Sequence, residues 1–265
     1  MTFAAIAFDV DARGVARLTL ARPDVHNAMN GQMYDEGREA VRRIEADPAI
    51  RAVVLSGQGQ SFCSGGDLKY QQAQASRPQS ERIQEASKLA LWLRELDRLS
   101  KPLIGRINGP AYAGGLGLIS VCDVAFTVDS AKFAITEARL GLLPGMISPY
   151  VVRRIGESHA RRLFLTGRRI SAQEAVSIGL FAGSVPAASL DEAIETELDM
   201  ILQCAPGALA AAKRLIEYVS SHGSEDNFTY TIDRVAEMWG WTEAAEGMRS
   251  FIEKRKPVWA ATKSS

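Results

Sequence analysis

Two pairs of glycines stand where the chain could bind an anionic oxygen. Gly65-Gly66 and Gly114-Gly115 each follow an apolar run that we expect to be a buried strand, and each leads into a segment compatible with a helix. Such a junction presents backbone N–H groups without side-chain bulk. If the N–H groups of Gly66 and Gly114 point to one place, they form a two-donor pocket for a carbonyl oxygen. That pocket would stabilise an enolate by about 3–4 kcal/mol per donor. A single glycine turn more often occurs only because glycine can adopt a positive φ. The presence of two such turns is what indicates a site.

Glu137 is the carboxylate that could work beside this pocket. It follows the apolar run Phe133–Thr136, which we expect to be a strand, and precedes a loop from Gly141 to Gly145. A carboxylate at a strand end becomes a general acid or base when it is partly desolvated. An ion pair with Arg139 is the alternative that the spacing supports equally well.

Other catalytic motifs are weaker or absent. A nucleophile at Ser64 is a minor alternative, because the surrounding sequence is not G-x-S-x-G and no base accompanies it. The dinucleotide fingerprint fails because Ser120 stands where its last glycine is needed, and no phosphate-binding P-loop is present. The histidines stand in no telling context: His26, His159 and His222.

Composition excludes several classes of protein. Of 265 residues, 46% are hydrophobic and 23% charged, with 31 basic and 31 acidic side chains, so a full core is attainable and a basic nucleic-acid surface is not expected. No apolar run is long enough to span a membrane, and the first residues resemble no targeting peptide. Widely spaced cysteines argue against zinc and favour a reduced cytoplasm: Cys63, Cys122 and Cys204. We expect no metal.

Strands and helices alternate up to residue 189, and the pattern is helical from Leu190 onward. The sequence predicts an α/β core of repeated ββα units over residues 1–189 and a helical region over residues 190–265. Residues 71–82 lack apolar periodicity, and we interpret them as a mobile or loosely helical flap. The other predicted core elements are a hairpin of Phe3–Val10 with Val15–Leu20, a helix capped by Asn30, strands Ala52–Leu55, Leu103–Ile107 and Val124–Val128, and helix Ile83–Leu99.

Along nearly its whole length the chain resembles the enoyl-CoA hydratase/isomerase (crotonase) superfamily. The stretches that carry the resemblance include His26-Asn27-Ala28-Met29-Asn30, Phe62-Cys63-Ser64-Gly65-Gly66-Asp67-Leu68-Lys69, Asn108-Gly109-Pro110-Ala111, Gly114-Gly115, Cys122-Asp123, Glu137, Leu140-Gly141, Pro144-Gly145, Leu165-Thr166-Gly167 and Glu246-Gly247. The resemblance implies a spiral of ββα units and a C-terminal helical region used to form trimers or dimers of trimers.

The resemblance also assigns roles to single residues. Gly66 and Gly114 would bind the thioester oxygen of an acyl-CoA, and the loop Gly66-Asp67-Leu68-Lys69 would contact its CoA part. CoA would enter as part of the substrate, with no other cofactor. Family hydratases carry two glutamates. The second matches Glu137, whereas the first falls on Gly117, which has no carboxyl group.

The departure at Gly117 leaves three hypotheses. Leu116-Gly117-Leu118 together with Ile147-Ser148-Pro149-Tyr150 is similar to bacterial hydratases of the 3-methylglutaconyl- and isohexenylglutaconyl-CoA type. Such a hydratase would use the room at Gly117 for a second water or a bulky 3-substituent. The alternatives are an enoyl-CoA isomerase that works with one glutamate, and an acyl-CoA-binding scaffold without activity.

Overall fold

A computed structural model describes residues 3–260 of the chain. It divides into two compact units, one of Met1–Leu99 with Leu103–Glu195, the other of Ser100–Pro102 with Thr196–Ser265. The boundary falls inside helix α7 (Leu190–Leu202), slightly later than residue 189. In the described range, no helix is long and apolar enough to cross a membrane.

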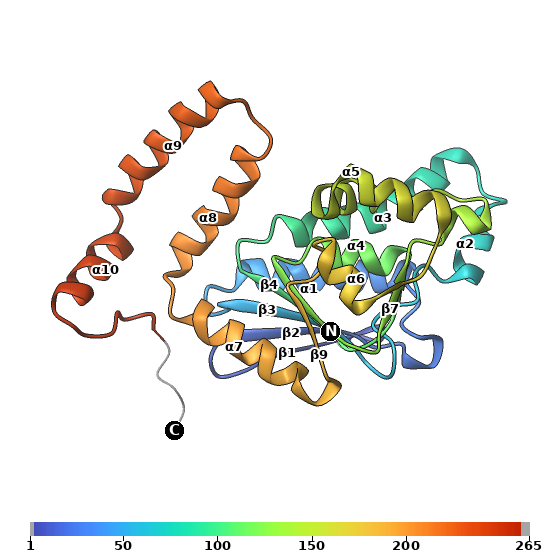
Figure 1. The fold of residues 1–265 in the computed structure, drawn as a ribbon, viewed down its shortest axis with the longest axis horizontal. Coiled ribbons are helices and arrows are strands. Elements are labelled where there is room, and N and C mark those ends of the chain that lie inside the picture. Colours follow the sequence, from blue (N-terminus) through green and yellow to red (C-terminus); the bar gives the residue numbers. More distant parts are fainter. Residues whose placement is uncertain (1–2, 261–265) are drawn as a thin grey trace. The chain divides into compact units, whose positions relative to one another are not determined.

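The first unit is built on a six-stranded sheet in the order β1-β2-β3-β4-β6-β9 (Figure 1). Only β1 and β2 pair antiparallel, as the predicted hairpin; the others pair in parallel. Every residue of β3 is buried, as expected of an apolar strand covered on both faces. The strand bounds are β1 Ile6–Val10, β2 Val15–Leu20, β3 Ala52–Gly57, β4 Leu103–Ile107, β6 Val124–Val128 and β9 Gly183–Val185.

A second, three-stranded sheet positions the site. Its strands are β5 (Ala111–Tyr112), β7 (Lys132–Ala134) and β8 (Ile170–Ser171), in that order. β5 and β7 run parallel, with Tyr112 opposite Ala134. The carboxyl ends of these two strands therefore lie at the same edge of the sheet.

A capping residue and a close helix–helix contact position the helices that cover the main sheet. The Asn30 side chain caps α1 by accepting a hydrogen bond from Met33 N at 3.0 Å, as predicted. The fully buried indole of Trp92 on α3 occupies the position that a Cβ of Gly37 would take, so α1 and α3 approach closely. The helices of this unit before α7 are α1 Gly31–Ala46, α2 Leu68–Gln74, α3 Gln79–Asp97, α4 Gly114–Ser120, α5 Ser148–Thr166 and α6 Ala172–Ser177, with 3-10 turns at Pro23–Val25, Glu137–Leu140 and Ala187–Ser189.

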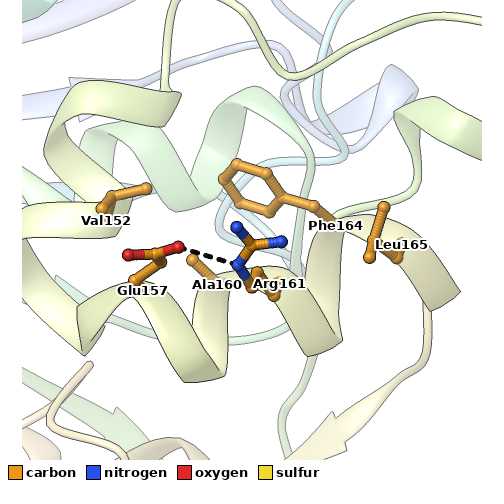
Figure 2. Close-up of a pocket in the computed structure, with 6 residues that line it drawn as sticks. All are labelled: Val152, Glu157, Ala160, Arg161, Phe164 and Leu165. Atoms are coloured by element: carbon orange, nitrogen blue, oxygen red, sulfur yellow. Dashed lines mark hydrogen bonds and ion pairs between the residues drawn. The ribbon is translucent and has the colours of Figure 1, made fainter.

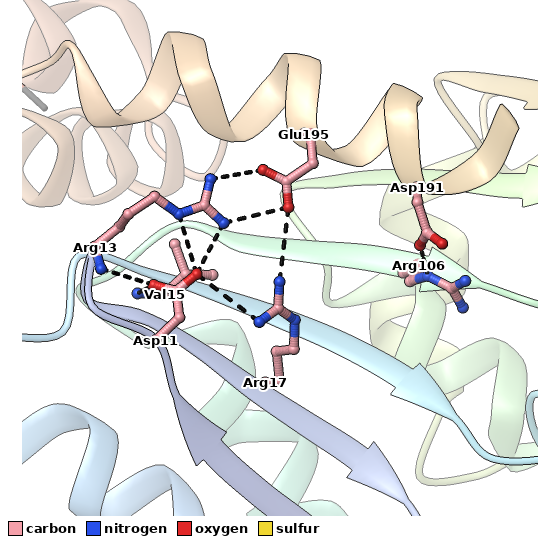
Figure 3. A network of polar contacts seen from close by, with 7 residues as sticks. All are labelled: Asp11, Arg13, Val15, Arg17, Arg106, Asp191 and Glu195. Atoms are coloured by element: carbon pink, nitrogen blue, oxygen red, sulfur yellow. Dashed lines mark hydrogen bonds and ion pairs between the residues drawn. The ribbon is translucent and has the colours of Figure 1, made fainter. Parts of the chain in front are cut away.

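A charged network fixes the first residues of α7 to the sheet (Figure 3). Arg13 donates to both carboxylate oxygens of Glu195, at 2.6 and 3.2 Å, and also pairs with Asp11. Arg106 on β4 pairs with Asp191. These contacts lie within the first unit and attach α7 to the turn between β1 and β2 and to β4.

Two local predictions are wrong. Residues 71–82 are not a loose flap: Asp67 caps α2, and α3 already begins at Gln79. The segment before Gly65 is not a strand, since it forms only the single bridge Cys63–Ala111. Helix α5 is interrupted at Gly156, where the backbone is not helical (φ +75°).

The second unit is helical, as predicted. It holds the end of α7 and three further helices, α8 (Pro206–Val219), α9 (Ser224–Trp239) and α10 (Thr242–Ile252). Glu243 on α10 accepts hydrogen bonds from Gly207 N and Ala208 N at 3.1 and 3.2 Å. A carboxylate thereby satisfies two free N–H groups at the start of α8.

Candidate active site

The two glycine turns lie in direct contact. Tyr112 N donates to Cys63 O at 2.9 Å beside the Cys63–Ala111 bridge. Gly65 has φ +97°, and a Cβ on it would lie 2.9 Å from Cβ of Ala113 and 3.1 Å from Tyr112 O. Only glycine fits both this conformation and this approach.

The backbone N–H of Gly66 is left without an acceptor. Met29 N donates to Gly65 O and Asp67 N donates to Met29 O, both at 2.8 Å, which forms the parallel bridge between Met29 and Gly66. In such a parallel bridge, the residue between the two bonded neighbours, here Gly66, directs its own N–H away from the partner segment. Within residues 3–260 the Gly66 N–H donates no hydrogen bond.

The N–H of Gly114 is free for a different reason. Gly114 is the first residue of α4, so its N–H has no acceptor within the helix. Ala113 before it donates to Ala134 O at 2.9 Å and is held at φ +51°, ψ −120°. An L-residue adopts this conformation only under strain, so neighbouring contacts determine the direction of the Gly114 N–H.

Glu137 lies just beyond the end of β7, at the same sheet edge as Gly114 beyond β5. The side chain is half-buried, and its Oε2 atom is buried without a hydrogen-bond partner in the described chain. Burial raises the pKa of Glu137, and hydrogen bonds from the backbone N–H groups of Glu137 and Thr136 offset only part of that effect. A partly desolvated carboxyl group of this kind can act as a general acid or base.

The alternative ion pair with Arg139 is not formed. Arg139 donates to Thr166 O at 3.3 Å, and its side chain lies against Gly167. The alternative nucleophile also lacks a base, because Ser64 Oγ donates to Val25 O at 3.3 Å while His26 pairs with Ser61.

The loop predicted to contact CoA divides into a structural and an exposed part. Asp67 accepts hydrogen bonds from Lys69 N and Tyr70 N, at 3.1 and 3.3 Å, and pairs with Arg22 at 3.1 Å. Burial opposes ionisation of Asp67, but these partners outweigh it and lower its pKa. Leu68 and Lys69 are exposed, and the Lys69 ammonium contacts no acid in the described range. Asp67 thus anchors the loop, while Lys69 is accessible.

The room expected at Gly117 is already filled. A Cβ on Gly117 would lie 2.4 Å from Cγ2 and 3.0 Å from Cβ of Ile147, and 3.4 Å from Cδ1 of Leu93. Ile147 precedes α5 and is buried. The glycine therefore accommodates an isoleucine, and the expectation of space here for a second water or a bulky 3-substituent is wrong.

The sequence alone assigned no role to Asn27. Asn27 is fully buried at φ +55°. It accepts a hydrogen bond from Arg22 N and donates to Gln58 O and Ser61 O, all at 2.9 Å. It thereby holds Arg22, and through Arg22 Asp67, beside the first glycine turn. A buried amide in a loop is recognisable only once burial is known.

A shallow hollow of about 220 Å³ lies on α5 (Figure 2). None of the predicted site residues lines it. It is lined by Val152, Glu157, Ala160, Arg161, Phe164 and Leu165. Its two charged side chains pair with each other at 2.8 Å, so they present no unpaired charge to a ligand.

Comparison with known proteins identifies the family of the chain. The sequence profile of the family "Enoyl-CoA hydratase/isomerase" matches residues 11–262, and the chain belongs to that family. A putative enoyl-CoA hydratase of Thermus thermophilus is 32% identical over 94% of this chain and 98% of its own length. Enoyl-CoA hydratase EchA19 of Mycobacterium tuberculosis is 35% identical over 94% of this chain and 94% of its own length.

Solved structures give the same fold. The crystal structure of an enoyl-CoA hydratase from Shewanella pealeana superimposes with a TM-score of 0.93 at 31% identity, covering 97% of this chain and 96% of that one. Pseudomonas aeruginosa AtuE superimposes with a TM-score of 0.92 at 35% identity, covering 97% and 100%. The fold is that of the crotonases.

Proposed function

We propose that the protein is an enoyl-CoA hydratase, which adds water across the 2,3 double bond of an enoyl-CoA thioester or removes it from the 3-hydroxy form. The observation that carries the proposal is the pair of unbonded N–H groups on contacting turns, with an unpartnered carboxyl oxygen at the same sheet edge. The relatives' names support it.

In this mechanism the Gly66 and Gly114 N–H groups donate to the thioester oxygen. They draw electrons from the double bond, so that C3 becomes electrophilic and the enolate that forms is stabilised. Ionised Glu137 takes a proton from the water whose oxygen bonds to C3. The protonated acid then gives a proton to C2, which regenerates the carboxylate and completes the addition.

Exposed apolar side chains next to Glu137 suit the hydrocarbon part of an acyl group. Leu140, Leu142 and Leu143 expose 56%, 49% and 75% of their surface, and they follow Glu137 within one loop. Soluble proteins leave several adjacent apolar side chains exposed mainly where something binds. The motif around Gly117 and Ile147, and not these leucines, supports a substrate of the 3-methylglutaconyl- or isohexenylglutaconyl-CoA type, whose acyl group carries a free carboxylate. Lys69 is accessible to a CoA phosphate.

Isomerase activity is the second candidate, and one observation favours it. Glu137 is the carboxylate at the site, and Ile147 fills the place where hydratases of the family would need a second one. One base suffices to move a proton from one carbon to another. An inactive acyl-CoA-binding scaffold is the third candidate.

One experiment separates these candidates. The purified protein is incubated with straight, 3-methyl-branched and 3-carboxymethyl-branched 2-enoyl-CoA and with 3-enoyl-CoA in oxygen-18 water. Mass spectrometry then follows the acyl group. A hydratase incorporates the label into a hydroxyacyl product. Conversion of 3-enoyl-CoA to the conjugated 2-enoyl-CoA without uptake of label would instead identify an isomerase. If no thioester is converted, the scaffold is the remaining candidate.

We further propose that the chain assembles as a trimer or a dimer of trimers through its C-terminal helices. On α9 four exposed apolar side chains recur at helical spacing: Phe228, Ile232, Val235 and Trp239. Three more on α10 are exposed by 55–86%: Met248, Phe251 and Ile252. Such stripes are typical of helix faces that are covered in an assembly.

A further inference from the structure

The side chain of Gln71 lies against Gly66. A Cβ on Gly66 would lie 2.1 Å from Nε2 of Gln71 and 2.9 Å from its Cδ. Since that Cβ would share the Cα with the backbone nitrogen, Nε2 lies within about 5 Å of Gly66 N. An oxygen hydrogen-bonded to the Gly66 N–H can therefore also lie within hydrogen-bonding distance of Gln71 Nε2.

The capped start of α2 explains this placement. Gln71 lies one turn into the helix, and its N–H donates to Asp67 O at 2.9 Å. Side chains on a helix lean toward its N-terminus, which carries the amide of Gln71 back over Gly66. The pairing of Asp67 with Arg22 holds that end of α2 in position.

The amide of Gln71 has unused donors. It forms no hydrogen bond with any described residue, although a primary amide has two N–H groups to donate. Gln74 on the same helix differs, because its Nε2 donates to Tyr70 O at 2.7 Å. Next to Gln71, the Gly66 N–H also lacks an acceptor. Adjacent donors without an acceptor point to an oxygen supplied by a ligand.

We propose that Gln71 is a third hydrogen-bond donor to the thioester oxygen of the substrate, beside the N–H groups of Gly66 and Gly114. The inference rests on the proposed function, because it takes an acyl-CoA thioester as the ligand. A donor on a side chain adjusts to the oxygen as negative charge grows there, so the bond strengthens in the enolate.

The test compares Gln71→Met with the wild-type enzyme. Methionine matches glutamine in length but has no N–H to donate. We expect kcat to fall about tenfold while KM changes less than about twofold, since a bond that strengthens in the transition state is lost. A 3-oxoacyl-CoA ligand, whose enolate absorbs in the ultraviolet, should also be enolised less on the variant at the same pH.

Gln71→Glu adds a second, pH-dependent readout. Its carboxylate places negative charge beside the developing enolate, so its activity should fall further than that of Gln71→Met near neutral pH. Protonation of the new carboxyl group restores a donor. The ratio of wild-type to variant activity should therefore shrink as pH is lowered.

Two controls separate donation from packing. Gln72→Met changes the exposed neighbouring glutamine and should leave kcat and enolisation unchanged. A CoA thioether, which has no carbonyl oxygen, should bind wild type and Gln71→Met equally. Wild-type kcat and enolisation in Gln71→Met, or an equal loss of thioether binding, would overturn the proposal. Failure of the wild type to bind or convert any acyl-CoA would instead refute the proposed function.

Discussion

At the scale of single residues, Glu137 determines how activity depends on pH. Burial raises its pKa above the ordinary glutamate value of about 4.3. Because the base must be ionised, kcat/KM should fall as pH decreases through that raised pKa. It should not fall again at high pH, since Gly117 supplies no second acid. Glu137→Gln should lower kcat at least about a hundredfold. A bell-shaped profile from two carboxyl groups would contradict this.

Glu137 should also lower stability at neutral pH. A raised folded-state pKa means that the folded protein holds the proton more tightly than the unfolded chain. The contribution of Glu137 to stability is therefore present below the unfolded pKa and is lost as pH rises through the folded pKa. Urea unfolding should show Glu137→Gln gaining stability relative to wild type as pH rises above the unfolded-state pKa of about 4.3.

Gly117 and Ile147 should be energetically coupled. In Gly117→Ala the new methyl group would meet the β-branched Ile147 at 2.4 Å. The variant should lose about 1–3 kcal/mol of unfolding free energy, despite the better helix propensity of alanine. Adding Ile147→Ala should cost less in this variant than in wild type, as a double-mutant cycle of urea unfolding can measure. Additive effects would mean that the two residues do not touch.

At the scale of elements, Gly65 keeps the two turns together. Gly65→Ala forces a methyl group to within 2.9 Å of Ala113 Cβ and strains a residue at φ +97°. We expect kcat to fall at least tenfold, because moving the turns apart would displace the N–H groups of Gly66 and Gly114 from the proposed common oxygen. Gly156→Ala is the matched control, with φ +75° and no atom within 4 Å of the new methyl group. Both variants suffer backbone strain, but only the first should lose turnover in a steady-state assay.

The sequence predicts elements better than the contacts between them. Asn30 and the apolar face of α1 predicted that helix, and Val15–Leu20 with its turn predicted the hairpin. The flap prediction failed because α2 depends on one cap, Asp67, and not on apolar periodicity. The contact between Ile147 and Gly117 joins residues from separate elements. No local sequence pattern indicates such a contact. The same holds for Gln71 beside Gly66.

At the scale of the whole molecule, the stripe on α9 should determine assembly. Ile232→Asp places a charge among exposed apolar side chains and should shift the protein toward monomers in light scattering after gel filtration. Asp233→Lys, on the exposed surface of the same helix, is the control and should leave the mass unchanged. A wild-type protein that is already monomeric would contradict the proposed assembly.

The central claim is that two backbone N–H groups bind one carbonyl oxygen. Infrared difference spectroscopy of an acyl-CoA labelled with carbon-13 at its thioester carbonyl measures this directly. On binding, the labelled band should shift to lower frequency, since hydrogen bonds weaken the C=O bond, and Gly65→Ala should reduce the shift. A bound thioester whose carbonyl band stays at its frequency in water, or a shift that Gly65→Ala leaves intact, would contradict the account.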